Sequence, residues 1–277
     1  MEEKIKYSIE LIKKAENLAL AMNESGFFVG FSGGKDSQVL LQLVKMSGVK
    51  YTAHYNVTTN DPVDNVNFIK TYYPEVVFDK PNRSFLQIVE KRGLPTQFKR
   101  FCCAELKETK GVGHVVLTGV RASESRKRAS YQEITKWGKH KNEIVKLDEM
   151  QERQFQCVNG KDKFMIYPIL HWNESDVWDF IKKNNLPINP CYRLTRRVGC
   201  VFCPYTSKRQ VLQYIQTHPK LYTALLHSLQ TFLDNNNSTH RNQFSYFQNA
   251  EDCFNWWIEK ISVKEYMERK KQLTLSM

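Results

Sequence analysis

The stretch "FVGFSGGKDSQVLLQL", residues 28–43, places two glycines and a lysine directly after an apolar run. The apolar run is typical of a buried strand, and residues 37–44 carry apolar side chains at helical spacing. Between them, Ser32, Gly33 and Gly34 let the backbone approach a ligand closely, and the following helix directs its positive end toward the same space. The stretch therefore predicts an anion-binding loop, with an ordinary strand-to-helix turn as the alternative.

The loop does not follow the Walker A pattern, because Val29 stands where that pattern needs its first glycine. The hexapeptide "SGGKDS" instead resembles the PP-loop of the N-type ATP pyrophosphatases, a group that includes thiolation enzymes and PAPS-reductase-like proteins. In that group AMP is joined to a substrate and pyrophosphate leaves. The resemblance implies that the pyrophosphate part of ATP is held by Ser32, Gly33, Gly34, Lys35, Asp36 and Ser37.

Length and composition are those of a globular protein with a positive charge. The chain has 277 residues, a net charge of +12 and a charged fraction of 25%. No apolar run reaches the roughly 18 residues that cross a membrane, and residues 1–22 alternate charged and apolar residues like an amphipathic helix, without the apolar core of a signal peptide. We therefore expect a cytoplasmic protein, and the charge favours polyanionic or phosphorylated partners.

Strand and helix patterns alternate along the first two thirds of the chain. Strands are predicted at residues 27–31, 51–59, 75–80, 114–122 and 163–170, with helical patterns between most of them. This alternation predicts an α/β fold with a three-layer parallel sheet, whose ligands gather at the carboxyl ends of the strands. The loop at 32–37 and the segment Gly119–Arg121 both fall there. Helical patterns alone follow, so we expect a nucleotide-binding domain over residues 1–204 and a helical extension over 205–277.

Seven cysteines in an expected cytoplasmic chain favour metal or redox chemistry over disulfides. Four of them form two groups, the pair Cys102 and Cys103 and the Cys-x-x-Cys motif of Cys200 and Cys203. Four thiolates can hold zinc or an iron–sulfur cluster, and adjacent ligands strain a single tetrahedral ion more than a larger cluster. Buried thiols without a metal are the remaining alternative.

Further motifs extend the resemblance from about residue 28 to 204: "TTNDPVDNVNFIK", "FCCAELK", "LTGVRASESRKR", "YPILHWNESDVWDFI" and "GCVFCP". Together they resemble the iron–sulfur branch of the PAPS-reductase-like family, which has the adenine nucleotide alpha hydrolase-like fold. That resemblance implies one [4Fe–4S] cluster on Cys102, Cys103, Cys200 and Cys203. The last seventy or so residues match nothing in the family pattern.

The family's sulfonucleotide reductases carry a C-terminal Glu-Cys-Gly-(Leu or Ile)-His segment, whereas this chain ends "KKQLTLSM" and has an intact loop. Both departures favour ATP-dependent activation over sulfonucleotide reduction. In this reading the loop amides, with Gly119 nearby, and Lys35 hold phosphates, and Asp36 binds Mg²⁺. Arg121 and Arg126 neutralise charge on the substrate phosphate or on the departing pyrophosphate.

Basic residues interleave with aromatic ones in residues 121–146, and a second basic group, Arg193, Arg196 and Arg197, precedes Cys200. Such segments can hold a phosphate backbone and stack bases, or they are solvated loops. Three functions remain open: ATP-dependent sulfur transfer, for which nucleic acid is the expected partner and a sulfur-donor protein a second one; reduction of adenylyl or phosphoadenylyl sulfate; and non-catalytic nucleotide sensing. Cys191 is a candidate sulfur-carrying thiol, with a packed thiol as the alternative.

Overall fold

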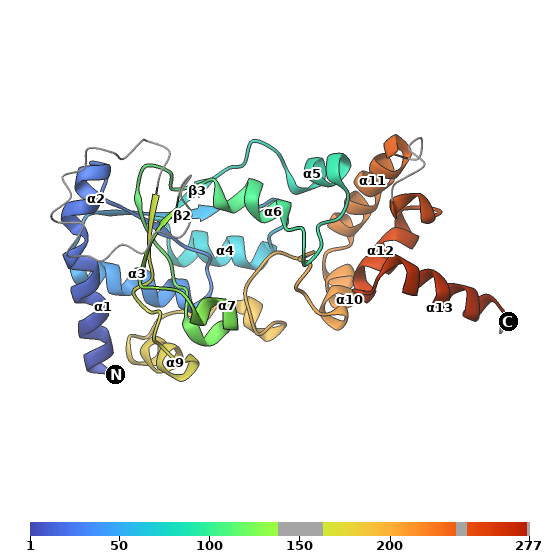
Figure 1. The fold of residues 1–277 in the computed structure, drawn as a ribbon. Coiled ribbons are helices and arrows are strands. Elements are labelled where there is room, and N and C mark those ends of the chain that lie inside the picture. The colour runs from blue at the N-terminus through green and yellow to red at the C-terminus, as the bar shows by residue number, and fades with distance from the viewer. Residues whose placement is uncertain (138–162, 237–242, 276–277) are drawn as a thin grey trace. The chain divides into compact units, whose positions relative to one another are not determined.

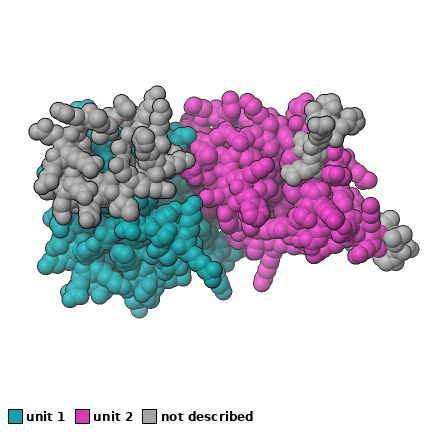
Figure 2. All heavy atoms as spheres, viewed as in Figure 1, with its two compact units in different colours: residues 1–56, 63–79, 109–198 teal, residues 57–62, 80–108, 199–277 magenta. Residues whose placement is uncertain are grey.

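The computed structural model describes residues 1–137, 163–236 and 243–275 (Figure 1). The chain folds into two compact units (Figure 2). Unit 1 contains residues 1–56, 63–79 and 109–198, and unit 2 contains residues 57–62, 80–108 and 199–277. The chain therefore passes between the two units several times, and the functional boundary expected after residue 204 stays a prediction.

Unit 1 is built on a six-stranded sheet in the order β3-β2-β1-β4-β6-β5. All neighbouring strands run parallel except β5, which pairs antiparallel with β6 at one edge. The strands are β1 (Phe27–Gly30), β2 (Tyr51–Asn56), β3 (Val77–Asp79), β4 (Val115–Leu117), β5 (Ile134–Trp137) and β6 (Lys163–Ile166). The predicted α/β class is confirmed, and each predicted strand is present. The antiparallel strand β5 was not expected.

The order of the strands reverses between β1 and β4. Chain order runs outward through β2 and β3 on one side of β1, and through β4 and β6 on the other. Loops that follow β1 and β4 therefore leave the sheet in opposite directions, which opens space for a ligand at their carboxyl ends. The segments after residues 30 and 117 begin at this point.

The helices of unit 1 connect and cover these strands. Helix α3 follows β1 and contacts both α1 and α9. It ends at Gly48, whose φ of 72° lies in the left-handed region that favours glycine. The elements are α1 (Glu2–Lys14), α2 (Glu16–Met22), α3 (Lys35–Ser47), α4 (Val63–Tyr72), the 3₁₀ turn η2 (Ala122–Glu124), α7 (Arg126–Ala129), α9 (Glu174–Lys183) and the 3₁₀ turn η3 (Pro190–Arg193).

Unit 2 is helical, and its core is rich in aromatic residues. Phe85, Phe202 and Phe254 are almost completely buried there, and the Trp257 indole donates to the Pro95 carbonyl at 2.6 Å. Residues 80–108 thus pack with the C-terminal helices. The elements are α5 (Phe85–Arg92), α6 (Phe101–Cys103), the π-helix η1 (Ala104–Glu108), α10 (Lys208–Thr217), α11 (Pro219–Asn236), η4 (Gln243–Tyr246), α12 (Ala250–Glu259) and α13 (Val263–Leu275).

No helix in the described ranges is both long enough and apolar enough to cross a membrane.

Candidate nucleotide loop and cysteine group

The loop after β1 depends on one glycine in a left-handed conformation. Gly33 has φ of +76°, and a Cβ there would lie 2.3 Å from the Asn65 side-chain oxygen. Gly34 differs, because its φ is −83° and an added Cβ would meet its nearest neighbour, the Tyr192 hydroxyl, at 3.4 Å. Gly33 is therefore required by the fold of the loop, whereas Gly34 leaves room above the backbone.

Buried side-chain amides hold the carbonyl groups of this loop. Asn65 donates to the Ser32 carbonyl at 3.2 Å, and Asn189 donates to the Gly33 carbonyl at 2.9 Å. Asn189 also donates to the Asn65 side-chain oxygen at 2.7 Å and is fully buried. The loop carbonyls are thus bound inside the protein, while the Gly34 and Lys35 N–H groups donate to the hydroxyls of Ser32 and Tyr192, whose place an anion can take.

The two serines of the loop bond to one another. The Ser37 hydroxyl lies 3.1 Å from the Ser32 hydroxyl and donates to the Gly34 carbonyl at 2.8 Å. The Ser32 backbone N–H donates to Ser37 at 3.2 Å. Both serines predicted for the loop thus shape its turn and fix the start of α3.

A buried ion pair joins this loop to the segment after β4. Arg121 Nε lies 2.6 Å from Asp36 Oδ1, and Arg121 is only 4% exposed. The two segments also approach at Gly119, where a Cβ would lie 2.7 Å from the Asp36 carbonyl oxygen. The structure therefore brings Asp36 together with Gly119 and Arg121, which are far from it in sequence, at the place where the strand order reverses.

Lys35 is buried at the first position of α3 and is surrounded by acceptors. Its ammonium lies 3.5 Å from Asp36 Oδ2 and 3.5 Å from Glu174 Oε1. Lys35 is 6% exposed, while the Glu174 side chain is largely exposed. Two cations and two carboxylates thus balance one another at the loop, and an incoming polyphosphate would compete with these carboxylates for Lys35 and Arg121.

Tyr192 of η3 binds the same loop. Its hydroxyl accepts a 2.7 Å hydrogen bond from the Lys35 backbone N–H, and its ring lies 5.8 Å from the Lys35 ammonium. Burial raises the pKa of the Tyr192 phenol, so the hydroxyl keeps its proton at neutral pH. The Tyr192 hydroxyl thus accepts the hydrogen bond of a backbone N–H at the N-terminus of α3. N–H groups at this position of a helix commonly bind phosphate oxygens.

The predicted Mg²⁺ role of Asp36 does not fit this arrangement. Both carboxylate oxygens already face cations, Arg121 at 2.6 Å and Lys35 at 3.5 Å. Within the described ranges, no group of three or more His, Cys, Asp or Glu side chains is arranged to hold a metal ion. We therefore derive no step of the chemistry through Mg²⁺.

Two buried oxygens at the same edge of the sheet have no hydrogen-bond partner within the described part of the chain. They are Asn56 Oδ1, at the end of β2, and Thr118 Oγ1, directly after β4. Buried polar atoms in proteins are nearly always bonded, and orphans mark places where a ligand or water binds. Both atoms lie at the carboxyl ends of strands that flank β1.

The structure does not bring Arg126 into this group. The residue begins α7 and is exposed, because the chain turns at Ser125, which caps α7 by accepting from the Arg128 N–H. Arg193, Arg196 and Arg197 are also exposed. Of the basic stretch at 121–146, residues 138–146 lie outside the described residues.

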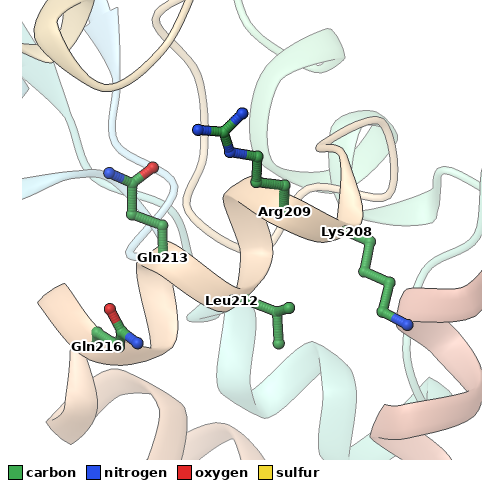
Figure 3. A pocket seen from close by; sticks show the side chains of 5 residues that line it. All are labelled: Lys208, Arg209, Leu212, Gln213 and Gln216. Atoms are coloured by element: carbon green, nitrogen blue, oxygen red, sulfur yellow. The ribbon is translucent and has the colours of Figure 1, made fainter.

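A pocket on α10 in unit 2 includes no residue of the loop after β1 (Figure 3). It is lined by Lys208, Arg209, Leu212, Gln213 and Gln216.

The four predicted cysteine ligands all belong to unit 2. Cys102 and Cys103 form most of α6, and Cys200 and Cys203 flank two buried residues that anchor their turn. Val201 donates to the Asn60 carbonyl at 2.8 Å, and Phe202 N–H donates to the Asn60 side chain at 3.2 Å. The anchors hold the Cys-x-x-Cys turn in the core, while the four cysteines themselves stay half-buried.

Electrostatic coupling places the four sulfurs in one neighbourhood. The hydrogen bond to Cys103, burial, and the negative charges of Cys103, Cys200 and Cys203 all raise the pKa of Cys102. The same hydrogen bond, donated by Cys102, lowers the pKa of Cys103 to about 6, and nearby Lys107 and Arg100 add to the effect against burial. One thiolate is therefore present at neutral pH, as metal ligation requires.

The donor set can be compared with the expected metals. Zinc needs four ligands converging on one ion at about 2.3 Å. Within the described residues no group of three or more His, Cys, Asp or Glu side chains is arranged to hold a metal ion, so the geometry favours neither zinc nor a cluster. Four thiols are a ligand set of both, and the adjacent pair Cys102 and Cys103 strains a single tetrahedral ion more than a cluster whose irons are bound separately. The chemistry of the set fits such a cluster.

The remaining cysteines give no sign of reactivity. Cys191 is 5% exposed, and burial raises its pKa to about 11. Burial likewise raises the pKa of Cys253 to about 12. Both thiols therefore stay protonated at neutral pH, which favours the packed-thiol alternative for Cys191 over a sulfur carrier. Cys157 lies outside the described residues.

Sequence reasoning missed the residues that support the loop from a distance. Asn65, Gln38, Glu174, Asn189 and Tyr192 all contact it. Asn65 and Asn189 lie in stretches that were noted for other reasons, "NDPVDNVNF" and "NPCYR", where neither residue had an assigned role. An asparagine beside a turn or in a helix is usually a cap or a surface residue, so only the folded chain reveals these two as buried anchors.

The mostly parallel sheet carries the candidate anion-binding loop at the carboxyl end of β1. The sequence model of the phosphoadenosine phosphosulfate reductase domain matches residues 26–206, well over half of the chain. The protein therefore belongs to that family.

Relatives were found among curated proteins and solved structures. An uncharacterized protein of Methanocaldococcus jannaschii is 27% identical over 84% of this chain and 54% of its own length. An adenosine 5'-phosphosulfate reductase of Staphylococcus haemolyticus is 24% identical over 62% of this chain and 68% of its own length. The U34-tRNA thiolase of Methanococcus maripaludis, solved with its [4Fe-4S] cluster, is 14% identical with a TM-score of 0.42, covering 86% and 80% of the two chains. The chain spans about half the length of the first two curated relatives, 54% and 42%.

The two loop glycines separate folding from ligand approach. Gly33→Ala should lower the free energy of unfolding by at least about 2 kcal/mol, because alanine resists the left-handed conformation and its Cβ would strike Asn65. Gly34→Ala should change that free energy by less than about 1 kcal/mol and still weaken ATP binding, because a methyl group covers the amides. Thermal unfolding and calorimetric titration with ATP measure the two effects. Undiminished ATP affinity in Gly34→Ala would contradict the assignment of this loop.

Tyr192 tests whether phosphate takes the Lys35 amide. If a phosphate oxygen replaces the Tyr192 hydroxyl when ATP binds, Tyr192→Phe removes a hydrogen bond from the free protein and none from the complex. ATP affinity should then rise about 2- to 10-fold, while the free protein melts at a lower temperature. Tyr222→Phe, in unit 2, is the control and should change neither quantity for this reason. A fall in ATP affinity would show that Tyr192 remains bound to the loop or to the nucleotide.

Proposed function

We propose that this protein activates a substrate with ATP, releasing pyrophosphate, and that the activated group then accepts sulfur. The observation that carries the proposal is the loop after β1, whose carbonyls are bound inward while Lys35 and Arg121 flank the N-terminus of α3. Membership of the phosphoadenosine phosphosulfate reductase domain family supports an adenine nucleotide as the ligand. The orphaned oxygens of Asn56 and Thr118 support a nucleoside beside the loop.

The activation step forms one bond and breaks one. An oxygen of the substrate attacks the α-phosphorus of ATP, and the bond from that phosphorus to the bridging oxygen of pyrophosphate breaks. The product is an AMP ester of the substrate, and the leaving pyrophosphate carries the added negative charge. Lys35 and the loop amides bind the β- and γ-phosphates, and Arg121 neutralises charge as pyrophosphate departs.

The second step replaces the activated oxygen with sulfur. Hydrosulfide attacks the activated atom, AMP leaves with the oxygen, and the proton of the hydrosulfide is released. Where the sulfur comes from a donor persulfide, the same attack gives a disulfide between the substrate and the donor. A second thiol then attacks the donor's sulfur, which releases the thiolated substrate and leaves a disulfide between that thiol and the donor. We propose nucleic acid as the substrate, because the chain carries a net charge of +12 and keeps Arg126, Arg193 and Arg196 exposed. A sulfur-donor protein is a second proposed partner, and a cytoplasmic location is part of the same proposal.

We propose that Cys102, Cys103, Cys200 and Cys203 hold a [4Fe–4S] cluster. The mutual influence of their thiols on one another's pKa, and the absence of other donor types among them, support this assignment. When bound, such a cluster supplies an iron site for sulfur or a centre for electron transfer. The protein's part is to keep the four thiols half-buried on anchored segments, with Thr58 3.5 Å from the Cys200 sulfur.

Reduction of a sulfonucleotide is the second candidate function. The adenosine 5'-phosphosulfate reductase of Staphylococcus haemolyticus matches 62% of this chain and supports it. That reaction cleaves a sulfur–oxygen bond of a bound nucleotide with electrons from a thiol, and it releases sulfite. It needs no pyrophosphate to leave, so the two candidates differ in their products.

Product analysis distinguishes the candidates. The anaerobically purified protein should release pyrophosphate from ATP in the presence of nucleic acid, and Lys35→Gln and Arg121→Gln should each lower that rate by about 10²-fold or more. Lys220→Gln, an exposed change in unit 2, is the charge-matched control. Sulfite release from adenylyl or phosphoadenylyl sulfate with a thiol, without pyrophosphate release, would establish the reductase instead. Tight ATP binding with neither product would establish a nucleotide sensor.

The metal assignment has its own test. Iron and acid-labile sulfide should each approach about four per chain after anaerobic purification, and Cys200→Ser should lower both, with loss of the brown absorbance. Cys253→Ser changes a buried cysteine with no proposed ligand role and is the control. The folded Cys253→Ser protein should contain as much iron as the wild type. Stoichiometric zinc without sulfide would overturn the cluster.

A further inference from the structure

Unit 2 presents an exposed aromatic side chain beside two cations. Phe98 is 97% exposed, and Lys99 and Arg100, which follow it, are exposed as well. Tyr205 is 56% exposed, and the Arg100 guanidinium lies 5.5 Å from the centre of its ring. We call these four residues the Phe98 platform.

The backbone beneath Phe98 is held in place. The Lys99 N–H donates to the Thr96 hydroxyl at 3.1 Å, and the Thr96 N–H donates to the Lys99 carbonyl at 3.3 Å, which closes the turn on both sides of Phe98. At the base of the turn, the buried Trp257 indole donates to the Pro95 carbonyl at 2.6 Å. The Phe98 ring therefore projects from a built turn and is not part of a loose segment.

The second aromatic residue is tied to the first turn. The Tyr205 hydroxyl donates to the Gln97 carbonyl at 3.2 Å, and the Gln97 side chain donates to the Pro204 carbonyl at 3.3 Å. These bonds join the segment that precedes Cys102 to the segment that follows Cys203. The platform thus extends from both halves of the cysteine group.

We infer that the Phe98 platform binds single-stranded nucleic acid, with bases stacked on Phe98 and Tyr205 and phosphates at Lys99 and Arg100. Aromatic rings interleaved with cations are the common means of binding single strands, because every base has a face to stack on. An exposed phenylalanine gains nothing for the fold, since the stabilisation that burial of such a ring would give is forgone. The inference rests on the nucleic-acid substrate of the proposed function, for which it supplies a site in unit 2.

The platform differs from the basic segments found in the sequence. Arg126 and Arg193 belong to unit 1, whereas Phe98 and Tyr205 belong to unit 2 and adjoin the cysteine ligands in sequence. A strand held there would present a nucleotide beside the four thiols. The charge pattern favours a polyanion over an apolar protein surface, because both residues that follow Phe98 are cationic.

Binding of fluorescein-labelled 20-nucleotide DNA and RNA single strands, measured by anisotropy without ATP, tests the inference. Phe98→Ala should weaken binding about 5- to 100-fold, and Phe98→Trp should restore it, with quenching of the new tryptophan emission. Lys99→Gln with Arg100→Gln should lower the slope of log affinity against log salt by about 1.4. The DNA and RNA arms identify the type of strand.

Matched changes elsewhere in unit 2 are the controls. Tyr246→Ala removes another exposed ring, and Arg209→Gln with Lys220→Gln removes two exposed charges, one of them from the α10 pocket (Figure 3). These variants should bind as the wild type does. Iron content and ATP affinity should be unchanged in Phe98→Ala, which shows that the fold is kept.

The possible failures are distinct. If Phe98→Ala binds single strands as tightly as the wild type does, the platform is overturned. The same holds if the control variants lose as much affinity as Phe98→Ala does. Both outcomes leave the nucleic-acid substrate of the proposed function standing. Binding of duplex as tight as that of single strands also overturns it, since paired bases offer no exposed face. Absence of any nucleic-acid binding overturns the platform together with the nucleic-acid part of the proposed function, while pyrophosphate release remains a separate readout.

Discussion

The inward-facing carbonyls of the loop after β1 are the constraint on which the site depends. A backbone turn that exposes N–H groups to a ligand must place its C=O groups somewhere, and buried carbonyls need donors. Asn65 and Asn189 supply these donors from elements that are remote in sequence. Because the left-handed Gly33 passes so close to Asn65, the glycine and the two amides form one cooperative unit. A change in any of them should disturb the whole anion site.

Charge balance is the second property of the site. Lys35 and Arg121 are nearly buried, and burying cations without partners would be costly. Asp36 and Glu174 offset that cost in the free protein. A polyphosphate can take over the same role, so ligand binding exchanges one set of anions for another. The partial exposure of Glu174 makes it the easier partner to displace, whereas Asp36 is held by Arg121 at 2.6 Å. The loop thus stays stable without ligand and remains available to one.

The sequence was sufficient for the local parts of this arrangement. Apolar runs and helical spacing placed the parallel strands and α3, because each pattern lies within one short segment. The strand β5 was missed since residues 134–137 are a short, mixed segment whose pairing with β6 is decided by tertiary contacts. The structure brings Arg121 to the loop, whereas Arg126, five residues on, is exposed at the start of α7. The turn at Ser125 that begins α7 directs the chain away, and nothing in the basic composition of that stretch distinguishes the two arginines.

The division of the chain follows from the same topology. Unit 2 takes its first two segments directly after β2 and β3, the strands whose carboxyl ends lie on the ligand side of the sheet. Loops at that edge tolerate insertion, because the sheet supplies stability and the connections carry function. The aromatic core around Phe85, Phe202 and Phe254 then unites these insertions with the C-terminal helices. Two cysteine segments some hundred residues apart therefore meet in one unit, and their anchoring by Asn60 and by the Gln97–Pro204 contact is a property of that unit alone. The nucleotide loop belongs to unit 1 and the cysteine group to unit 2, and the contacts described above for each of them lie within its own unit. A variant in one should leave the fold of the other intact.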